Sequence, residues 1–524
     1  MVKFWKPFRV MVSLVILLLI TFSFIDFKQA IPSSWYNGIL FLQFVPSVRK
    51  FLIVVSFLSA GFVVVLALTL LFGRVYCSTI CPLGIFQDIT SFISKKFQRK
   101  PFRFKYSKPY HILRYTFFGL AAIPLLFGSI TIVYLLDPYS NFGRFASDFG
   151  RPLYILLNNV LANVLIKFKI YSLAPYDIAH FDALVLIFPL LLLLLVVYLS
   201  IKRGRLYCNT ICPVGTFLGL LSKISLFKIR INQSTCTKCA KCAIVCKSEC
   251  ISIKEQSVDF SRCVGCFNCL RACDNSSINY KFVVPLAKNK PVINSKTDES
   301  KRSFIANSLI LTGALAGIST MGRAEKPGLK YRKNLTPIKK KHVCSPPGSI
   351  SIDHFNNACT ACHLCVSACP SGVLQPSLLE YGMIGFMQPY LDNHTNYCNI
   401  ECVKCSEVCP TGAILPITKN IKKTCQIGQV HFIKNNCVVF TDETSCGACS
   451  EHCPTQAVKM VPYKGKLTIP EVNVELCIGC GACEHPCPVR PHRAIYVEGN
   501  VVHKVSKKPE IKKIEEKQTE DFPF

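Results

Sequence analysis

The segment GRVYCSTICPLGIF at Gly73–Phe86 recurs as GRLYCNTICPVGTF at Gly204–Phe217, with ten of the 14 positions identical. Each copy closes a long apolar stretch and contains a Cys-x3-Cys-Pro motif. If such a segment is helical, its two cysteines lie on one face. The repeat therefore predicts a two-unit membrane domain whose cofactor-binding candidates are the motif cysteines, Cys77, Cys81, Cys208 and Cys212. The spacing leaves open whether they hold a metal, a cluster or a disulfide relay, or only pack as small thiols.

Four apolar stretches lie around these motifs and are each close to the length that crosses a hydrocarbon core. They are residues 10–25, 51–72, 112–136 and 182–201. Residues 152–166 are also apolar, but three asparagines interrupt them, which predicts an interfacial or re-entrant helix. Lysines and arginines precede the first span and follow the second and the fourth, so these flanks are expected to be cytoplasmic. The formal charge of +31 fits such flanks and docking faces better than nucleic acid.

Residues 236–273 contain two Cys-x2-Cys-x2-Cys-x3-Cys motifs, a pattern typical of two-cluster ferredoxins. In these proteins, three thiolates of one motif and the last cysteine of the other hold each 4Fe–4S cluster. The predicted ligand sets are Cys236, Cys239, Cys242 with Cys273, and Cys263, Cys266, Cys269 with Cys246. Zinc is the weaker interpretation, because it is normally held by paired Cys-x2-Cys units. Lys247 and Asp274 stand where proline usually follows, and Cys250 is expected to be a free thiol.

Four further cysteine motifs lie between residues 359 and 488, each with proline after its last cysteine. The same interleaving predicts four more clusters, so six clusters use 24 of the 31 cysteines. The sets are Cys359, Cys362, Cys365 with Cys409; Cys398, Cys402, Cys405 with Cys369; Cys437, Cys446, Cys449 with Cys487; and Cys477, Cys480, Cys483 with Cys453. Cys425 is an alternative to Cys437, and Cys344 is a spare thiol.

One motif has a second interpretation. Cys359–His363 also reads as a c-type haem attachment site, Cys-x2-Cys-His. Because it lies inside a complete ferredoxin motif, haem is not expected there, and His363 is expected to be an exposed loop residue.

The segment between the two cluster modules predicts a further crossing. Ser300–Ile305, followed by apolar residues to about Ser319, resembles a twin-arginine export signal with lysine in place of the first arginine. Inside a longer chain it is expected to form a fifth span, with the C-terminal module outside. The alternative is a buried hairpin that keeps this module inside.

The predicted fold class is an α-helical membrane domain, with four spans plus the fifth, joined to α+β two-cluster ferredoxin-like modules. The expected domains are the membrane domain 1–225, a cytoplasmic two-cluster module 226–284, a linker 285–300, the fifth span 301–322, a periplasmic four-cluster module 323–500 and a flexible tail 501–524.

At the level of these motifs, the chain resembles two known protein families. Residues 1–280 resemble NapH, the membrane quinol dehydrogenase component of periplasmic nitrate reductase systems, through both Gly-Arg-x-Tyr-Cys-x3-Cys-Pro elements and the 236–273 unit. Residues 300–495 resemble NapG, the exported partner with four 4Fe–4S clusters, so the chain is similar to a fusion of the two. The resemblance implies a bacterial inner-membrane protein that oxidises menaquinol or ubiquinol and passes electrons to a periplasmic reductase or cytochrome. It also implies electron or cofactor chemistry at the four membrane cysteines.

No phosphate-binding loop, nucleophile elbow or dinucleotide fingerprint occurs, so no terminal substrate site is expected within the chain. The expected function is a membrane relay from quinol to a periplasmic terminal reductase, acting as a quinol dehydrogenase-type component. Its expected partners are the membrane, the quinone pool and the reductase, with no nucleic acid. The alternative is a membrane ferredoxin that assists maturation or reactivation of a respiratory metalloenzyme. A redox sensor is a third interpretation, without a visible output domain.

Overall fold

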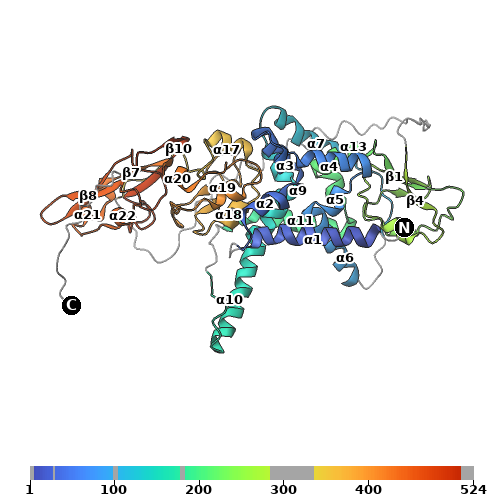
Figure 1. The fold of residues 1–524 in the computed structure, drawn as a ribbon, viewed down its shortest axis with the longest axis horizontal. Coiled ribbons are helices and arrows are strands. Elements are labelled where there is room, and N and C mark those ends of the chain that lie inside the picture. Colours follow the sequence, from blue (N-terminus) through green and yellow to red (C-terminus); the bar gives the residue numbers. More distant parts are fainter. Residues whose placement is uncertain (1–4, 27–29, 98–103, 177–182, 284–334, 509–524) are drawn as a thin grey trace, which may run out of the picture.

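The computed structural model describes residues 5–26, 30–97, 104–176, 183–283 and 335–508. The linker 285–300 and the fifth span expected over 301–322 lie outside the described residues. Along the longest axis, the chain forms three parts in a row: the 226–283 module at one end, the helices of the membrane domain in the middle and the C-terminal module at the other end (Figure 1).

The membrane domain contains helices α1 to α13. Their bounds are α1 Trp5–Ile25, α2 Ser33–Leu40, α3 Phe44–Ile53, α4 Gly61–Phe72, α5 Tyr76–Thr79, α6 Pro82–Phe97, α7 His111–Leu126, α8 Thr131–Leu136, α9 Pro138–Phe145, α10 Arg151–Lys167, α11 Ala183–Arg203, α12 Leu206–Thr210 and α13 Pro213–Ser222. A π-helical turn, Ala146–Gly150, joins α9 to α10.

The two sequence repeats adopt the same local structure. Gly73 and Gly204 end α4 and α11 with φ of 78° and 61°, a conformation that glycine adopts without strain. A short helix, α5 or α12, then carries the first cysteine of each motif. Pro82 and Pro213 begin the next helices, where a fixed φ suits the first helical position and the missing N–H costs nothing.

In the described residues, three helical runs are long and apolar enough to cross a membrane by length and composition: Trp5–Ile25, Pro138–Lys167 and Ala183–Arg203. The stretches 51–72 and 112–136, expected as single spans, are instead each broken into shorter helices. Pro124 in the last turn of α7 and Gly128, with φ of 84°, interrupt the helix before α8. Between α3 and α4, the hydroxyl of Ser59 donates to Val54 O at 2.9 Å and stabilises a turn.

Several helices of the membrane domain run along the longest axis of the molecule. Their ends contact the two cluster modules alternately. At the 226–283 end, the Tyr280 hydroxyl donates to Phe72 O at 3.1 Å, and Arg203 pairs with Glu249 at 2.8 Å. At the other end, the Tyr134 hydroxyl donates to Ile384 O at 2.9 Å. Successive helices thus end alternately beside one module and beside the other.

Helix α10, where an interfacial or re-entrant helix was expected, is continuous with α9 through the π-helical turn. It projects from the body and runs crosswise to α1 and α11 (Figure 1). Two of its interrupting asparagines bind the chain that returns beside it, Asn158 through Ala174 O at 3.0 Å and Asn159 through Tyr176 O at 2.7 Å. The continuous helix formed by α9 and α10 is thus long enough to span a membrane, but α10 runs in a different direction from α1 and α11.

The 226–283 module consists of two antiparallel strand pairs and two short helices. Its elements are β1 Phe227–Ile231, α14 Lys241–Ile244, β2 Ile251–Ser252, β3 Ser257–Val258, α15 Asn268–Ala272 and β4 Ile278–Phe282. β1 pairs with β4, with Ile229 opposite Tyr280, and β2 pairs with β3.

The C-terminal module is built from short helices and three antiparallel strand pairs. Its elements are α17 Ile352–Ala358, α18 Leu364–Ala368, β5 Leu374–Pro376, β6 Pro389–Leu391, α19 Lys404–Val408, α20 Lys419–Lys422, β7 Cys425–Phe432, α21 Val438–Thr441, α22 Ala448–Glu451, β8 Val458–Pro462, β9 Thr468–Val472 and β10 Ile495–Val505. β10 pairs with β7, so residues 501–505, expected to belong to the flexible tail, form part of a strand, and residues 509–524 of that expected tail lie outside the described residues.

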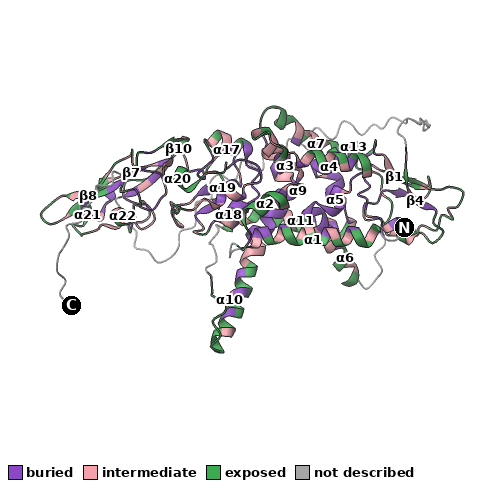
Figure 2. Ribbon diagram, viewed as in Figure 1, coloured by how far each residue is buried: buried purple, intermediate pink, exposed green. Residues whose placement is uncertain are grey.

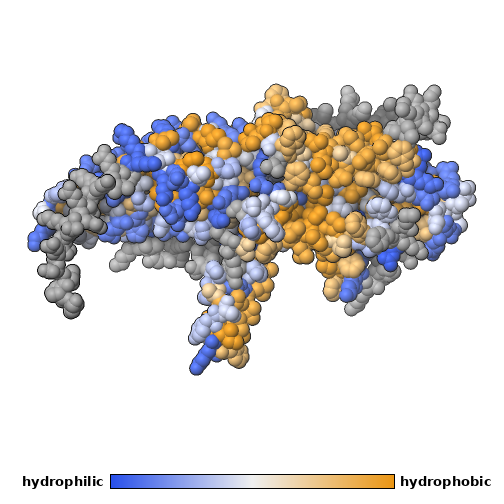
Figure 3. All heavy atoms as spheres, in the orientation of Figure 1, coloured by the Kyte–Doolittle hydropathy of each residue, from blue (hydrophilic) through white to orange (hydrophobic). Residues whose placement is uncertain are grey.

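Burial and surface polarity follow this division. Buried residues gather around α5 and α9 and within both cluster modules, whereas the outer faces of α1 and α10 are exposed (Figure 2). On the face shown in Figure 3, apolar surface covers the central helices, and hydrophilic surface lies toward both ends. An apolar middle between polar ends is what a protein embedded in a bilayer requires.

Candidate functional site

The four membrane cysteines, predicted from the repeat, come together in the centre of the molecule. Each is at most 4% exposed. Cys81 lies close enough to Cys77 and Cys208 for the charges of their thiolates to interact. Cys212 is likewise within this range of the other three membrane cysteines. All are free thiols. Two motifs separated by more than a hundred residues thus form one buried set of four sulfurs.

The repeats exchange their arginines around this set. Arg74 Nη2 of the first repeat donates to Cys208 O at 3.0 Å, and Arg205 Nη1 of the second donates to Cys77 O at 2.7 Å. Gly84 and Gly215 make this close approach feasible, because a Cβ at either would lie 2.2 Å from the carbonyl oxygen of the same cysteines. The conserved spacing within each repeat therefore builds a pseudo-symmetric site.

Several groups direct N–H donors or positive charge at the four sulfurs. Gly215 N donates to Cys212 Sγ at 3.2 Å, and Gln87 Nε2 to Cys208 Sγ at 3.3 Å. Arg74 and Arg205 each place a guanidinium nitrogen 3.9 Å from a cysteine sulfur. Among the described residues, buried Arg205 Nη2 and Arg74 Nε have no hydrogen-bond partner. Four thiols beside buried cations with unused donors fit an anionic metal–thiolate group.

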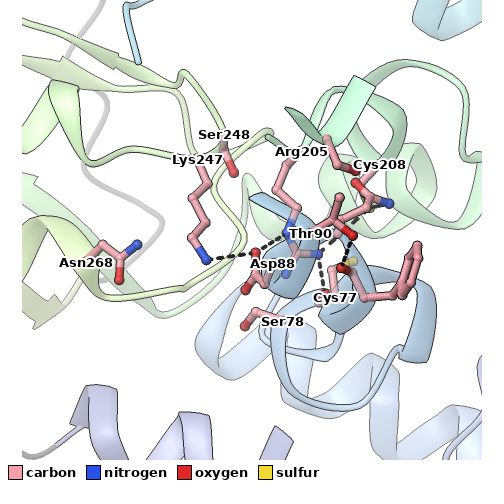
Figure 4. Close-up of polar contacts among 12 residues, drawn as sticks. Cys77, Ser78, Asp88, Thr90, Arg205, Cys208, Lys247, Ser248 and Asn268 are labelled. Carbon is pink, nitrogen blue, oxygen red and sulfur yellow. Dashed lines mark hydrogen bonds and ion pairs between the residues drawn. The ribbon is translucent and has the colours of Figure 1, made fainter. Parts of the chain in front are cut away.

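The 226–283 module contacts this centre through the residues that follow its cysteines. Lys247, directly after Cys246, pairs through Nζ with Asp88 Oδ1 of α6 at 3.2 Å, and its carbonyl accepts from Arg205 N at 3.0 Å. Asp88 Oδ1 in turn accepts from Arg205 Nε at 2.9 Å (Figure 4). The residue that replaces the usual proline is therefore an anchor between the module and the membrane domain.

Asp88 is the centre of this anchor. Its side chain is 12% exposed and also lies 3.6 Å from Arg9 Nη1. Burial acts to raise the pKa of the Asp88 carboxyl, but the charges of Arg205, Lys247 and Arg9 hold that pKa well below its usual range. Asp88 is thus a carboxylate at neutral pH, shared by three cations.

Both predicted cysteine sets of this module are brought together. Cys236, Cys239, Cys242 and Cys273 line one cavity of about 170 Å³. Cys263, Cys266 and Cys246 surround Cys269 closely enough for their charges to interact. Cys250, expected as a free thiol, lies with its sulfur 3.5 Å from Cys246 Sγ. Asp274, at the second missing proline, pairs with Lys241.

The C-terminal module groups its cysteines in the same interleaved way. The charges of Cys359, Cys362 and Cys409 act on Cys365, and those of Cys398, Cys369 and Cys402 act on Cys405. The charges of Cys477, Cys480 and Cys453 act on Cys483. In the second of these sets, Lys422 Nζ donates to Cys398 Sγ at 3.1 Å.

The structure distinguishes Cys437 from Cys425 in the remaining set. Cys437, Cys446, Cys449 and Cys487 line one cavity. Burial, with smaller effects of Cys446 and Cys487, raises the pKa of Cys437. Cys425 instead faces His503, with Sγ 3.9 Å from Nδ1. Over the described residues, no three His, Cys, Asp or Glu side chains converge on a single-ion site; cluster thiolates bind separate irons and so surround a larger group.

The C-terminal module docks on the membrane domain through its first cysteine set. A Cβ at Gly143 of α9 would lie 2.4 Å from Cys362 O, so glycine permits this approach. His363, expected to be exposed, is instead buried, and its Nδ1 lies 2.8 Å from Asp148 Oδ1. The expectation was wrong because the membrane domain covers this loop, which local sequence does not reveal.

The structure adds three residues to this site. Arg74 and Arg205 stand at identical positions of the repeat, which is the sequence signal that marks them beside the cysteines. The sequence does not mark Asp88 as a site residue, because a single acidic residue in an amphipathic helix usually faces solvent. The signal that did exist was the unusual Lys247 after Cys246.

Comparison with known families identifies iron–sulfur domains in three regions. A 4Fe-4S binding domain matches residues 55–101 and 185–232, which include both Cys-x3-Cys-Pro motifs. Two families described as 4Fe-4S dicluster domains match residues 358–414 and 444–490. The prediction of 4Fe–4S binding is confirmed for residues 358–414 and 444–490. For the membrane motifs, whose ligand the sequence left open, the match favours an iron–sulfur cluster. The chain is a ferredoxin-type iron–sulfur protein of electron transfer with apolar helices of spanning length.

The chain is also similar to individual ferredoxin-type proteins over part of its length. The methylamine utilization ferredoxin-type protein MauM of Methylophilus methylotrophus is 33% identical over 27% of this chain and 65% of its own. The putative electron transport protein YccM of Escherichia coli is 31% identical over 24% and 31%, respectively. The ferredoxin-type protein NapG of Escherichia coli is 28% identical over 23% and 48%. No solved structure matches the chain.

Proposed function

We propose that this chain is a fused NapH- and NapG-type relay in a bacterial inner membrane, which takes electrons from menaquinol or ubiquinol and delivers them to a periplasmic reductase or cytochrome. One observation supports this proposal above all. The four buried membrane cysteines lie between two cysteine-rich modules, and these modules contact opposite ends of the membrane domain (Figure 1). A hydrocarbon core is about 30 Å thick, so a relay across it needs a carrier within it.

The residues in this chain provide the continuous contacts that such a relay requires. On one side, Lys247 links Cys246 to Arg205 and so to the four-cysteine centre. On the other, the Tyr207 hydroxyl accepts from Asn141 Nδ2 at 3.1 Å, and Tyr139 lies beside Cys362. Both flanks of the centre are thus packed protein.

Iron–sulfur clusters bound at the six predicted cysteine sets would supply one-electron transfer, with potentials tuned by charge and hydrogen bonds to sulfur. Around the membrane set, Arg74, Arg205 and Gln87 direct positive charge or N–H groups at the sulfurs. These groups stabilise added negative charge and therefore raise the reduction potential of this site.

The proposal is tested with the full-length protein in proteoliposomes, with menaquinol as donor and the electron paramagnetic resonance signals of reduced clusters as readout. The Cys208→Ser variant is expected to retain reduction of the 226–283 module and to slow reduction of the C-terminal module at least tenfold. The matched control is Cys344→Ser, a buried thiol outside the predicted sets. A wild-type protein in which menaquinol reduces no cluster would end the proposal.

The proposed delivery of electrons to the periplasmic side is tested separately. A tag placed after Phe524 should be removed by protease added to intact spheroplasts. A tag that is cut only after the spheroplasts are lysed would put the C-terminal module in the cytoplasm and contradict delivery to a periplasmic acceptor.

A further inference from the structure

A cavity of about 660 Å³ lies between α1, α6 and the 226–283 module. Its volume is within the range of small-molecule sites. Its apolar wall comes from the two helices of the membrane domain, through Val10, Leu14, Ile85, Ile89 and Phe92. Leu14 and Phe92 are 43% and 69% exposed, so this wall continues to the outer apolar surface. A ligand with a long apolar tail would have an entrance there.

The polar part of the cavity is strongly basic. The described residues that line it include Lys6, Arg9, Lys95, Lys247 and Arg271, with Asp88 as their single acid. Asp88 is already shared with Arg9, Lys247 and Arg205, and buried Arg9 Nε has no hydrogen-bond partner among the described residues. Burial and the charge of Lys247 lower the pKa of Lys95 to about 8. The excess positive charge favours a head group with acceptor oxygens that become negative.

This basic end also lies beside a predicted cysteine set. Val245 and Lys247 of the lining flank Cys246, and Asn268 precedes Cys269. The charge of Cys266 acts on Lys95. An electron donor bound here would lie against the cysteine set Cys263, Cys266, Cys269 and Cys246.

We propose that this cavity binds quinone, with its ring at the basic end and its isoprenoid tail along Leu14 and Phe92. The inference rests on the quinol oxidation proposed above and specifies where it occurs. Oxidation of one quinol to quinone releases two electrons and two protons. The protons would pass to water on the cytoplasmic side, and an iron–sulfur cluster held by Cys263, Cys266, Cys269 and Cys246 would accept the electrons one at a time. The cations favour this step, because they lower the pKa of the quinol hydroxyls.

An acidic phospholipid is the competing occupant, since its head group is anionic and its chains are apolar. The lining residues Val245, Lys247 and Asn268, which are the sequence neighbours of Cys246 and Cys269, favour a redox ligand, because a structural lipid does not need a predicted cluster set beside it.

The test measures binding of 2-heptyl-4-hydroxyquinoline N-oxide, a fluorescent quinone analogue, to the full-length protein in detergent. Leu14→Trp and Ile89→Trp fill the cavity from two different helices, and Leu18→Trp places the same side chain elsewhere on α1, where Leu18 is 68% exposed. Both cavity variants are expected to weaken binding at least tenfold, with iron content unchanged, whereas Leu18→Trp binds as the wild type does. Menaquinone is expected to displace the analogue.

Cluster reduction by menaquinol, measured in the same variants, separates the two proposals. If the wild type is reduced and both cavity variants are reduced equally fast, the cavity assignment is wrong although the relay stands. If the wild type is not reduced at all, the relay itself fails. If phosphatidylglycerol displaces the analogue and menaquinone does not, the cavity is a lipid site and the assignment is also wrong.

Discussion

His363 Nδ1 lies 2.8 Å from Asp148 Oδ1, and neither side chain is exposed. The other ring nitrogen, Nε2, donates to Met387 O at 2.9 Å. Both ring nitrogens of His363 therefore have a buried polar partner. The two residues are 215 positions apart and join α18 of the C-terminal module to the π-helical turn of the membrane domain. This is a deeply buried polar contact between the two parts.

Removing one partner of this pair should weaken the attachment of the C-terminal module. Asp148→Ala leaves a buried imidazole unpaired and is expected to cost about 3–5 kcal/mol, the range for breaking a buried pair. Thermal unfolding of the purified protein measures the loss. Glu443→Ala is the control, because its pair with Lys464 is exposed and is worth at most about 1 kcal/mol. Equal effects of the two substitutions would show that the buried pair does not hold the module.

The four-cysteine centre should be intolerant of a single methyl group at either repeat. Gly84→Ala and Gly215→Ala each place a Cβ 2.2 Å from a backbone carbonyl oxygen, Cys77 O or Cys208 O, respectively. Each is expected to destabilise the protein by about 1–3 kcal/mol, typical of overpacking, and to lower its iron content. Gly119→Ala in α7 meets no atom within 4 Å and should leave both quantities intact. If one repeat tolerated alanine and the other did not, the pseudo-symmetric site would be disproved.

Iron analysis should distinguish Cys437 from Cys425. Cys437→Ser removes one member of the cavity formed with Cys446, Cys449 and Cys487, so the protein is expected to lose about four irons, one cluster. Cys425→Ser is expected to keep the full content, because that thiol faces His503. The opposite pattern would transfer the ligand role to Cys425.

The stability of the C-terminal module should rise with pH in the acidic range. Burial lowers the pKa of His503 from 6.5 to about 4, so the folded state favours neutral imidazole. Between these values the unfolded chain binds more protons, and the folded state therefore loses stability as the pH falls from about 6.5 toward 4. The full shift corresponds to about 3 kcal/mol at most.

Thermal unfolding followed by circular dichroism at several pH values between 5 and 7.5 measures this dependence. His503→Gln should reduce the slope, since glutamine does not titrate, but should not abolish it, because burial also lowers the pKa of His394 to about 4. An unchanged slope in the variant would assign the dependence to another group.

Ligand spacing is local, which is why much of the cysteine chemistry was predictable. Within Cys359–Cys369, for example, a short helix and the residues on either side of it carry all four cysteines of one motif. Interleaving with Cys409 follows from a general rule for two-cluster modules, and the structure brings that partner close. The lengths of the spans were less predictable, because breaks such as the one at Gly128 depend on one or two residues in an otherwise apolar stretch.

By itself, the sequence determined the repeat, the apolar stretches and the cysteine motifs, since each is written in neighbouring residues. Only the tertiary structure decided which distant groups meet: the four membrane cysteines, Lys247 with Asp88, and His363 with Asp148. The tertiary structure also determined that a cavity forms between α1 and α6. The physical reason is that such contacts depend on how separate helices pack, and packing joins surfaces whose positions no local pattern specifies.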